Sequence, residues 1–136
     1  DAEPVCRAEH KETYISLERT WNSCSSITLC LDLHPRVVYD SRPENVQSGK
    51  QFIAFCDGPI VLARDARINA DVGMPVTFVP EAFRIEKSED FGIESGGNYL
   101  VRTGRDETSR MIDYASAGAT WNEASEMECW LPVQKT

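Results

Sequence analysis

Short segments in which hydrophobic and polar residues alternate recur along the chain, and this alternation is typical of half-buried β-strands. The clearest of them is 25–33, where four residues fall on one side: Ile27, Leu29, Leu31 and Leu33. Runs rich in β-branched and aromatic residues predict further strands at 13–17, 73–79, 98–102 and 126–133. A short apolar run at 51–56 ends in a strong turn signal, Asp57-Gly58-Pro59.

Helical signals are confined to short stretches. Residues 80–87 begin with proline and carry acidic residues early and a basic residue late, which favours a short helix. Residues 60–70 fit a strand followed by a helical turn, and the pattern does not decide between strand and helix. Segments at 88–97, 103–109 and 115–125 are predicted loops. The sum predicts an α+β fold, with small mixed or antiparallel β-sheets and short helices.

The transition from strand to helix is most sharply marked at residues 36–49. Val37–Tyr39 suit a pleated surface, and Asp40 and Ser41 can cap the start of a helix. Pro43 is tolerated in a first helical turn, and Gly49 can take the left-handed conformation that often ends a helix. Unpaired N–H groups at such a corner favour an anionic ligand.

Length and charge limit the possible classes of protein. The 136 residues fit one domain with its own core. The longest apolar runs are far shorter than a membrane span. The net charge of −8 argues against binding to a nucleic-acid backbone, which needs clustered lysine and arginine. Neither nucleic acid nor a membrane is therefore an expected partner.

Five cysteines predict two disulfides and one remaining thiol in an oxidising compartment: Cys6, Cys24, Cys30, Cys56 and Cys129. A bridge from Cys6 or Cys56 to Cys129 would stabilise most, because it closes a long loop. A reduced protein with small buried cysteines is the alternative. The pattern Cys24-x5-Cys30-x3-His34 matches no common zinc motif, so no metal site is predicted. We expect a secreted protein whose signal peptide has been removed.

Five parts of the chain follow one another in the order of motifs found in a known enzyme family. They are Asp40-Ser41-Arg42-Pro43 with Gln47-Ser48-Gly49, then Gly73–Phe78, Asn98–Arg102, Met111–Tyr114, and Glu126-Met127-Glu128 with Leu131-Pro132. In this order they resemble the A chains of cholera-type and pertussis-type ADP-ribosylating toxins, the heat-labile enterotoxin A family. The resemblance implies an ADP-ribosyltransferase-like region at 36–133 within a single domain, 1–136. Residues 1–35 would then be an N-terminal extension with extra strands.

The resemblance implies chemistry on NAD, whose bond between nicotinamide and ribose is cleaved through a cationic transition state. A glutamate stabilises that cation electrostatically. By position in the closing motif, Glu128 would be the catalytic residue and Glu126 the accessory one. Without the resemblance, both would be read as the solvent face of an alternating strand.

The same comparison implies that Arg36, Asp40, Arg42 and Thr77 would hold NAD. The arginine of the family's opening strand falls on Val38, and only Thr77 remains of its Ser-Thr-Ser motif. These departures indicate a degenerate catalytic set, so whether the chain is an enzyme stays open. No cofactor is expected unless the chain is active, in which case the cofactor would be NAD.

Three hypotheses about function emerge. The first is a secreted, toxin-like effector with an ADP-ribosyltransferase-like fold that acts by binding a host or partner protein. The second is an active NAD-dependent transferase or glycohydrolase, with Arg36 or Arg42 in place of the missing arginine. The third is an unrelated extracellular binding or inhibitor module, for which we expect no strand-to-helix corner at 40–43 and no cleft joining it to Glu128.

Overall fold

The chain divides into two compact units, residues 1–31 and residues 32–136. The computed structural model describes residues 23–28, 30–31, 33–122 and 125–134. The predicted strand at 13–17 therefore lies outside the described residues. Every helix and strand of the described residues belongs to the second unit.

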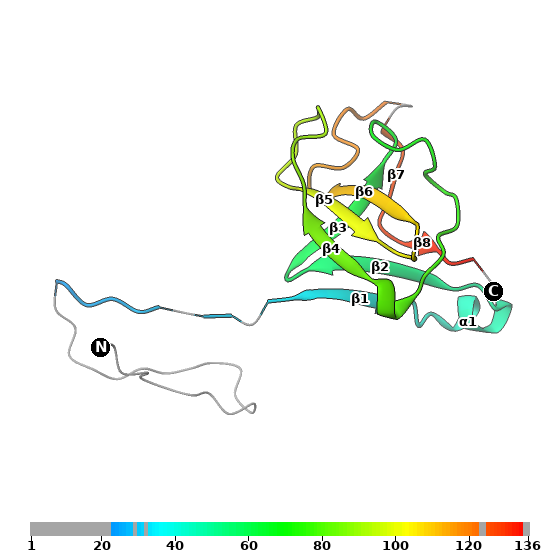
Figure 1. Cartoon of the computed structure of the whole chain (residues 1–136), viewed down its shortest axis with the longest axis horizontal. Coiled ribbons are helices and arrows are strands. Elements are labelled where there is room, and N and C mark those ends of the chain that lie inside the picture. Colours follow the sequence, from blue (N-terminus) through cyan, green and yellow to red (C-terminus); the bar gives the residue numbers. More distant parts are fainter. Residues whose placement is uncertain (1–22, 29, 32, 123–124, 135–136) are drawn as a thin grey trace. The chain divides into compact units, whose positions relative to one another are not determined.

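Antiparallel sheet is the main secondary structure of this unit (Figure 1). Its strands are β1 (Pro35–Tyr39), β2 (Phe52–Asp57), β3 (Ile60–Asp65), β4 (Arg84–Lys87), β5 (Asn98–Arg102), β6 (Thr108–Asp113), β7 (Met127–Glu128) and β8 (Leu131–Pro132). The first six lie in the order β1-β2-β3-β6-β5-β4, with β7 beside β3 and β8 beside β2. The helical elements are α1 (Pro43–Ser48) and a 3-10 turn, η1 (Pro80–Ala82). The expectation of a small mixed fold with short helices is confirmed.

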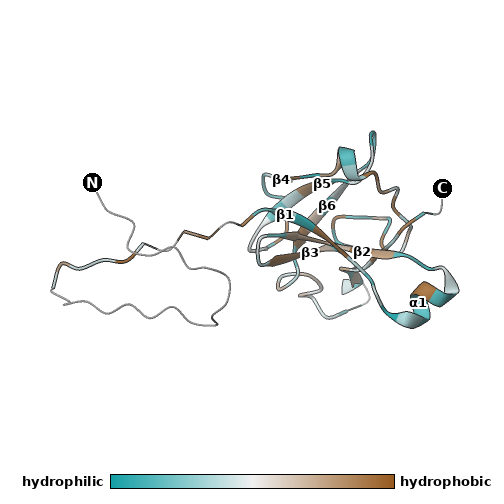
Figure 2. Cartoon of the chain, turned by 90° about the horizontal axis from the view of Figure 1, so that it is seen from below, coloured by the Kyte–Doolittle hydropathy of each residue, from teal (hydrophilic) through white to brown (hydrophobic). Residues whose placement is uncertain are grey.

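The hydrophobic core lies on the concave side of a curved sheet. Phe55, Leu62 and Tyr99 belong to one buried cluster. Val37 of β1 and Ile85 of β4 pack against the same cluster, although these strands form opposite ends of the strand order. Both ends of the sheet therefore curve toward one core. In Figure 2 the hydrophobic colour is concentrated on central strands such as β3, whereas α1 is largely hydrophilic.

The predicted strand-to-helix corner is confirmed, but the predicted cap is not, because Arg42 is the N-cap residue and no side chain in the described part of the chain caps the helix. β1 ends at Tyr39, and the backbone N–H of Arg42 donates to Oδ1 of Asp40 at 3.0 Å. Pro43 is the first residue of α1, where its missing N–H costs nothing. Gly49 ends the helix in the left-handed conformation, with a φ of 66°.

One predicted strand is absent. The described residues of segment 25–33, which are 25–28, 30–31 and 33, form no strand. Side chains that we expected to be half-buried, such as Ile27, Leu31 and Leu33, are instead exposed. Alternation marks a possible strand, but the backbone groups of a strand also need a neighbour with which to hydrogen-bond.

Two further predictions are wrong and one is refined. Residues 73–79 are not a strand, since only Val76 makes an isolated parallel bridge, to Val133. Residues 80–87 are η1 followed by β4, because pairing with β5 overrides the helical signal. The last predicted strand, 126–133, is divided into β7 and β8 by a bend.

Candidate functional site

A buried carboxylate fixes the end of β3. Asp65 is the last residue of this strand, and its side chain is fully buried. Arg67 donates to it from the backbone N–H at 2.9 Å, from Nε at 2.8 Å and from Nη2 at 2.7 Å. A carboxylate that accepts from the N–H two residues later forms an Asx turn, which ends the strand here. Burial raises the pKa of Asp65, but hydrogen bonds from Arg67 and Gly118 outweigh it and lower this pKa to about 2.

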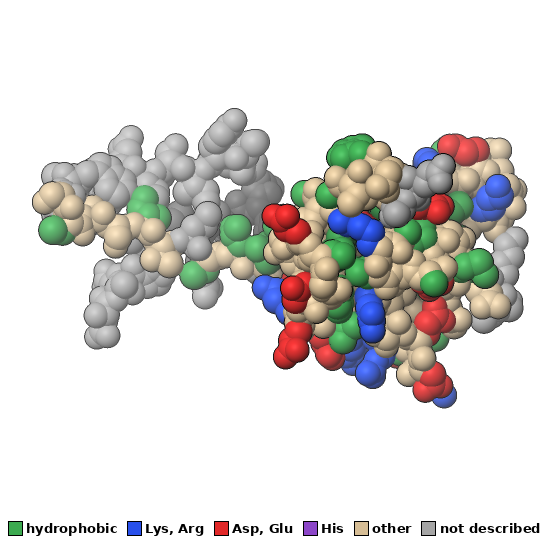
Figure 3. Space-filling view, turned by 90° about the horizontal axis from the view of Figure 1, so that it is seen from above, with side chains coloured by type: hydrophobic (Ala, Val, Ile, Leu, Met, Phe, Trp, Pro, Cys, Tyr) green, Lys and Arg blue, Asp and Glu red, His purple; other side chains and the backbone are tan. Residues whose placement is uncertain are grey.

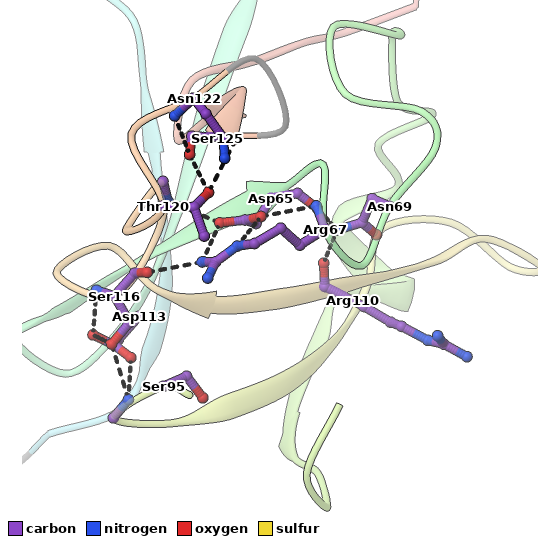
Figure 4. Close-up of polar contacts among 12 residues, drawn as sticks. Asp65, Arg67, Asn69, Ser95, Arg110, Asp113, Ser116, Thr120, Asn122 and Ser125 are labelled. Atoms are coloured by element: carbon purple, nitrogen blue, oxygen red, sulfur yellow. Dashed lines mark hydrogen bonds and ion pairs between the residues drawn. The ribbon is translucent and has the colours of Figure 1, made fainter. Parts of the chain in front are cut away.

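The ion pair between Asp65 and Arg67 also holds the loop that comes after β6 (Figure 4). Gly118 donates its N–H to Asp65 Oδ2 at 2.8 Å, and Arg67 Nη2 donates to the carbonyl of Ser116 at 3.0 Å. Ser116 is fixed a second time, because its N–H and Oγ donate to Asp113 Oδ1 at 3.1 Å and 2.9 Å. Two carboxylates therefore anchor the loop at 114–118.

Trp121 stands at the end of this anchored loop with a strained backbone. Its φ is 49°, the only positive value for a residue other than glycine in the described part of the chain. An aromatic residue rarely takes this conformation, which costs about 1–3 kcal/mol. Its side chain is not held in the core, since the residue is 90% exposed.

Local hydrogen bonds hold the turn around Trp121. Its N–H donates to the carbonyl of Gly118 at 3.1 Å. The N–H of Asn122 donates to Ser125 Oγ at 3.0 Å, and Thr120 Oγ1 is hydrogen-bonded to the same hydroxyl (Figure 4). These bonds fix the backbone of the turn from which the exposed Trp121 side chain projects.

A cavity of about 510 Å³ opens beside the indole. Its apolar lining comes from Ala117, Trp121 and Met127, and its polar lining from Asn122, Ser125 and Glu126. An exposed aromatic ring beside a partly apolar hollow is a surface that can take a side chain from another molecule.

Glu128 lies beside a buried arginine. The β3–β7 ladder pairs Arg64 with Glu128, and Arg64 Nη1 donates to Glu128 Oε1 at 3.1 Å. Arg64 Nη1 also donates to the carbonyls of Asp71 and Met74, and Glu128 Oε1 accepts the N–H of Gly73 at 3.0 Å. The Arg64 side chain is 1% exposed and that of Glu128 14%. This arrangement ties the segment 71–74 to β7.

The pKa of Glu128 is raised. Burial is the main cause, and the charges of Asp71 and Glu126 add to it. The Gly73 N–H and the Arg64 guanidinium oppose the shift without cancelling it.

The structure brings together only some of the residues that the sequence indicated. Glu126 is exposed and lies just before β7, so it is close to Glu128. Asp40 and Arg42 pair with each other at 2.7 Å, and the Arg42 guanidinium lowers the pKa of Asp40. Within the described part of the chain, neither Asp40 nor Arg42 makes a hydrogen bond or an ion pair with Glu126 or Glu128.

Arg36 and Thr77 lie elsewhere. Arg36 Nη1 donates to the carbonyl of Gly58, and Arg36 lines a second cavity, of about 400 Å³, with Trp130 among its other residues. The Thr77 N–H donates to the Glu107 carboxylate at 3.2 Å. Neither of the two cavities is lined by Asp40 or by Glu128, so neither is a cleft that joins the corner to the glutamate.

Sequence reasoning missed Asp65, Arg67 and Trp121. Asp65-Ala66-Arg67 follows the apolar run 60–63 after one intervening residue, Arg64, and an aspartate at the end of a strand signal of this kind favours an Asx turn. Trp121 lies in a segment of small and polar residues, where nothing nearby in sequence would bury it.

Comparison of the chain with protein-family models, with curated proteins and with solved structures gave no match. Among the described residues, no group of three or more His, Cys, Asp or Glu side chains is placed to hold a metal ion. No helix in the described ranges has the length and apolar character needed to cross a membrane.

Proposed function

We propose that the chain is a secreted, toxin-like effector that acts by binding a partner protein, and that the surface around Trp121 makes the contact. The observation that carries the proposal is a tryptophan that is 90% exposed on a strained, hydrogen-bonded turn. Tryptophan is enriched among the few residues that supply most of the energy of protein interfaces. Backbone strain that the surroundings hold in place is also concentrated at functional sites.

The anchoring of the loop supports a binding role. Asp65 and Arg67 hydrogen-bond to the backbone of the loop, and the hydroxyls of Thr120 and Ser125 hydrogen-bond to each other within the turn. A binding residue that is already ordered loses less conformational entropy when its partner arrives. The backbone that carries the indole is therefore ordered before a partner arrives, and only the side chain of Trp121 remains to be fixed on binding.

Charge defines the partner that this surface fits. The chain carries a net charge of −8, and exposed Glu126 lines the cavity beside Trp121. A carboxylate beside an exposed indole is complementary to a protein with an apolar pocket that has a lysine or arginine at its edge. On the face seen in Figure 3, charged side chains of both signs are interspersed, so the acidity there is not one continuous patch.

The finer fold assignment, an ADP-ribosyltransferase-like fold with a degenerate catalytic set, belongs to the same proposal. The order of the five sequence segments and the corner at Asp40–Pro43 support it. The Trp121 surface does not depend on it, and would serve an unrelated extracellular binding module equally well.

The experiment compares three purified proteins: the wild type, Trp121→Ala and Trp130→Ala. Trp130 is the matched control because it is a second surface tryptophan that lines the other cavity. Proteins that the wild type captures from cell extracts are purified, whether or not the variants also capture them, and their affinities for all three are measured.

We expect Trp121→Ala to weaken binding by about 30-fold, which corresponds to about 2 kcal/mol, whereas Trp130→Ala binds as the wild type does. We also expect affinity to fall as salt is raised, because the partner is basic. A purified partner that binds the wild type and Trp121→Ala equally would refute the proposed surface.

An active NAD-dependent transferase or glycohydrolase is the second candidate. The observation that favours it is the contact between Arg64 and Glu128, which places a guanidinium beside the predicted catalytic glutamate. Against it stands the burial of Arg64, whose side chain is 1% exposed. NAD turnover that disappears in a folded Glu128→Gln variant would establish the enzyme, and turnover that is absent or unchanged would exclude this role for Glu128.

A further inference from the structure

Two cysteines border the second cavity. Cys56 lies in β2 and is buried, with 3% of its surface exposed. Cys129 lies in the bend between β7 and β8 and is half-buried. Both line the cavity of about 400 Å³. The other residues that line this cavity are mostly apolar. Neither the shape nor the chemistry of the cavity indicates a different function for the two thiols.

The strand register brings the bend close to β2. Ile53 of β2 pairs with Leu131 of β8, and Arg64 of β3 pairs with Glu128 of β7. Cys129 lies between these two paired positions. The bend therefore connects a strand that pairs with β3 to a strand that pairs with β2. Adjacent strands in a sheet are about 4.8 Å apart, so the bend lies close to both β2 and β3.

The two thiols also share a face of the sheet. Cys56 pairs with Val61 across the β2–β3 hairpin, and Cys129 packs against the cluster that contains Ala63, two residues further along β3. Residues two apart in a strand point to the same side. Ala54, two residues before Cys56 in β2 and therefore on the same side of the strand, lines the same cavity.

Electrostatics agree with this proximity. Burial is the main cause that raises the pKa of the Cys129 thiol. Two charge effects, from Glu128 and then from Cys56, raise it further.

We propose that Cys56 and Cys129 are a redox pair that closes to a disulfide between β2 and the β7–β8 bend. The oxidant is a small-molecule disulfide such as oxidised glutathione. The sequence alone left the pairing open and named Cys6 and Cys56 as examples of partners for Cys129. Cys6 lies outside the described residues, whereas Cys56 shares the cavity with Cys129, and both of these thiols are free in this structure. The proposal goes beyond the binding function and does not involve Trp121.

The chemistry is two successive thiol–disulfide exchanges. Cys129, the more exposed thiol, loses its proton and attacks one sulfur of oxidised glutathione, which releases one glutathione thiolate. The Cys56 thiolate then attacks Sγ of Cys129 and releases the second. Each leaving thiolate takes up one of the protons, so two protein thiols and one oxidised glutathione give one protein disulfide and two reduced glutathiones.

The test uses the full chain, equilibrated with a mixture of reduced and oxidised glutathione and then treated with an alkylating reagent. Mass spectrometry of a non-reduced digest is expected to find a peptide containing Cys56 linked to one containing Cys129. A variant that keeps only these two cysteines carries the substitutions Cys6→Ser, Cys24→Ser and Cys30→Ser. On oxidation it is expected to lose the mass of two hydrogen atoms.

Stability gives a second readout. Reduction of the two-cysteine variant is expected to lower its Tm by about 10 °C, because the bridge closes a loop that contains β3 to β6. Addition of Cys56→Ala is expected to remove this response to reductant. Alkylation of both thiols after oxidation, or linkage of Cys129 to any other cysteine of the wild type, would overturn the proposal. Either result would leave the Trp121 surface unaffected.

Discussion

Replacement of Asp65 by asparagine tests whether the buried ion pair supports the loop that carries Trp121. The asparagine keeps the size of the side chain but removes its charge and one of its two acceptor oxygens. Arg67 and Gly118 donate to both oxygens, so the variant leaves donors without an acceptor beside a side chain that is fully buried.

The pKa of Asp65 gives the magnitude. It is about 2 in the folded chain and about 3.9 in an unfolded chain. At about 1.4 kcal/mol for each pKa unit, the ionised carboxylate contributes roughly 2–3 kcal/mol to the free energy of unfolding at neutral pH. Because the folded pKa is the lower one, this contribution is complete above about pH 4 and is lost as pH falls toward 2.

Urea unfolding at pH 7 and at lower pH values measures the effect. We expect Asp65→Asn to lower the free energy of unfolding by about 3 kcal/mol at pH 7, since removal of one partner leaves a poorly compensated charge. We also expect the difference from the wild type to shrink between about pH 4 and pH 2. Asp106→Asn is the control, because Asp106 is exposed and the expected change is below about 0.5 kcal/mol.

A double-mutant cycle identifies the partner. Arg67→Met alone leaves the carboxylate of Asp65 without its main donor, whereas the double variant removes both charges. We therefore expect the double variant to lose less stability than the sum of the two single variants, by about 1–3 kcal/mol. Strict additivity, or an Asp65→Asn variant as stable as the wild type, would show that this ion pair does not anchor the loop.

Three further predictions concern the loop and Glu128. Gly118→Ala is expected to lower the free energy of unfolding by about 2 kcal/mol, since its φ is +67° and a Cβ would lie 3.1 Å from the carbonyl of Ser125; Gly104→Ala, which meets only ordinary contacts, is the control in the same denaturant assay. Trp121→Gly is expected to unfold at the same or a higher denaturant concentration, because glycine relieves the strain of a positive φ; a clear loss of stability would contradict the assigned strain. An NMR titration is expected to find the pKa of Glu128 above the usual 4.5, so that its contribution to stability declines as pH rises through this pKa.

Local signals in the sequence predicted local structure well. Proline at the first helical position and glycine at the helix end placed α1 correctly, because each acts through its own backbone dihedral angles. The turn at Asp57-Gly58-Pro59 was found from residues of the same kind. The strand at 98–102 was found from its β-branched and aromatic residues. Whether segment 25–33 or segment 84–87 forms a strand depends on a neighbouring strand, which alternation alone does not reveal.

The candidate site was harder to predict because its residues come from distant parts of the chain. Glu128 was singled out for chemistry, but its contact with Arg64 arises from the β3–β7 pairing. Asp65 and Gly118 meet only after β3 and β6 have become neighbours. The exposure of Trp121 results from a left-handed turn that no residue type in that segment announces.

The affinity of Trp121→Ala for a purified partner, measured beside the wild type and Trp130→Ala, is the decisive test of the proposed binding surface. We predict a loss of about 30-fold for Trp121→Ala and none for Trp130→Ala. Unchanged affinity in Trp121→Ala, or a loss confined to Trp130→Ala, would contradict the proposal and move the binding surface away from the anchored loop.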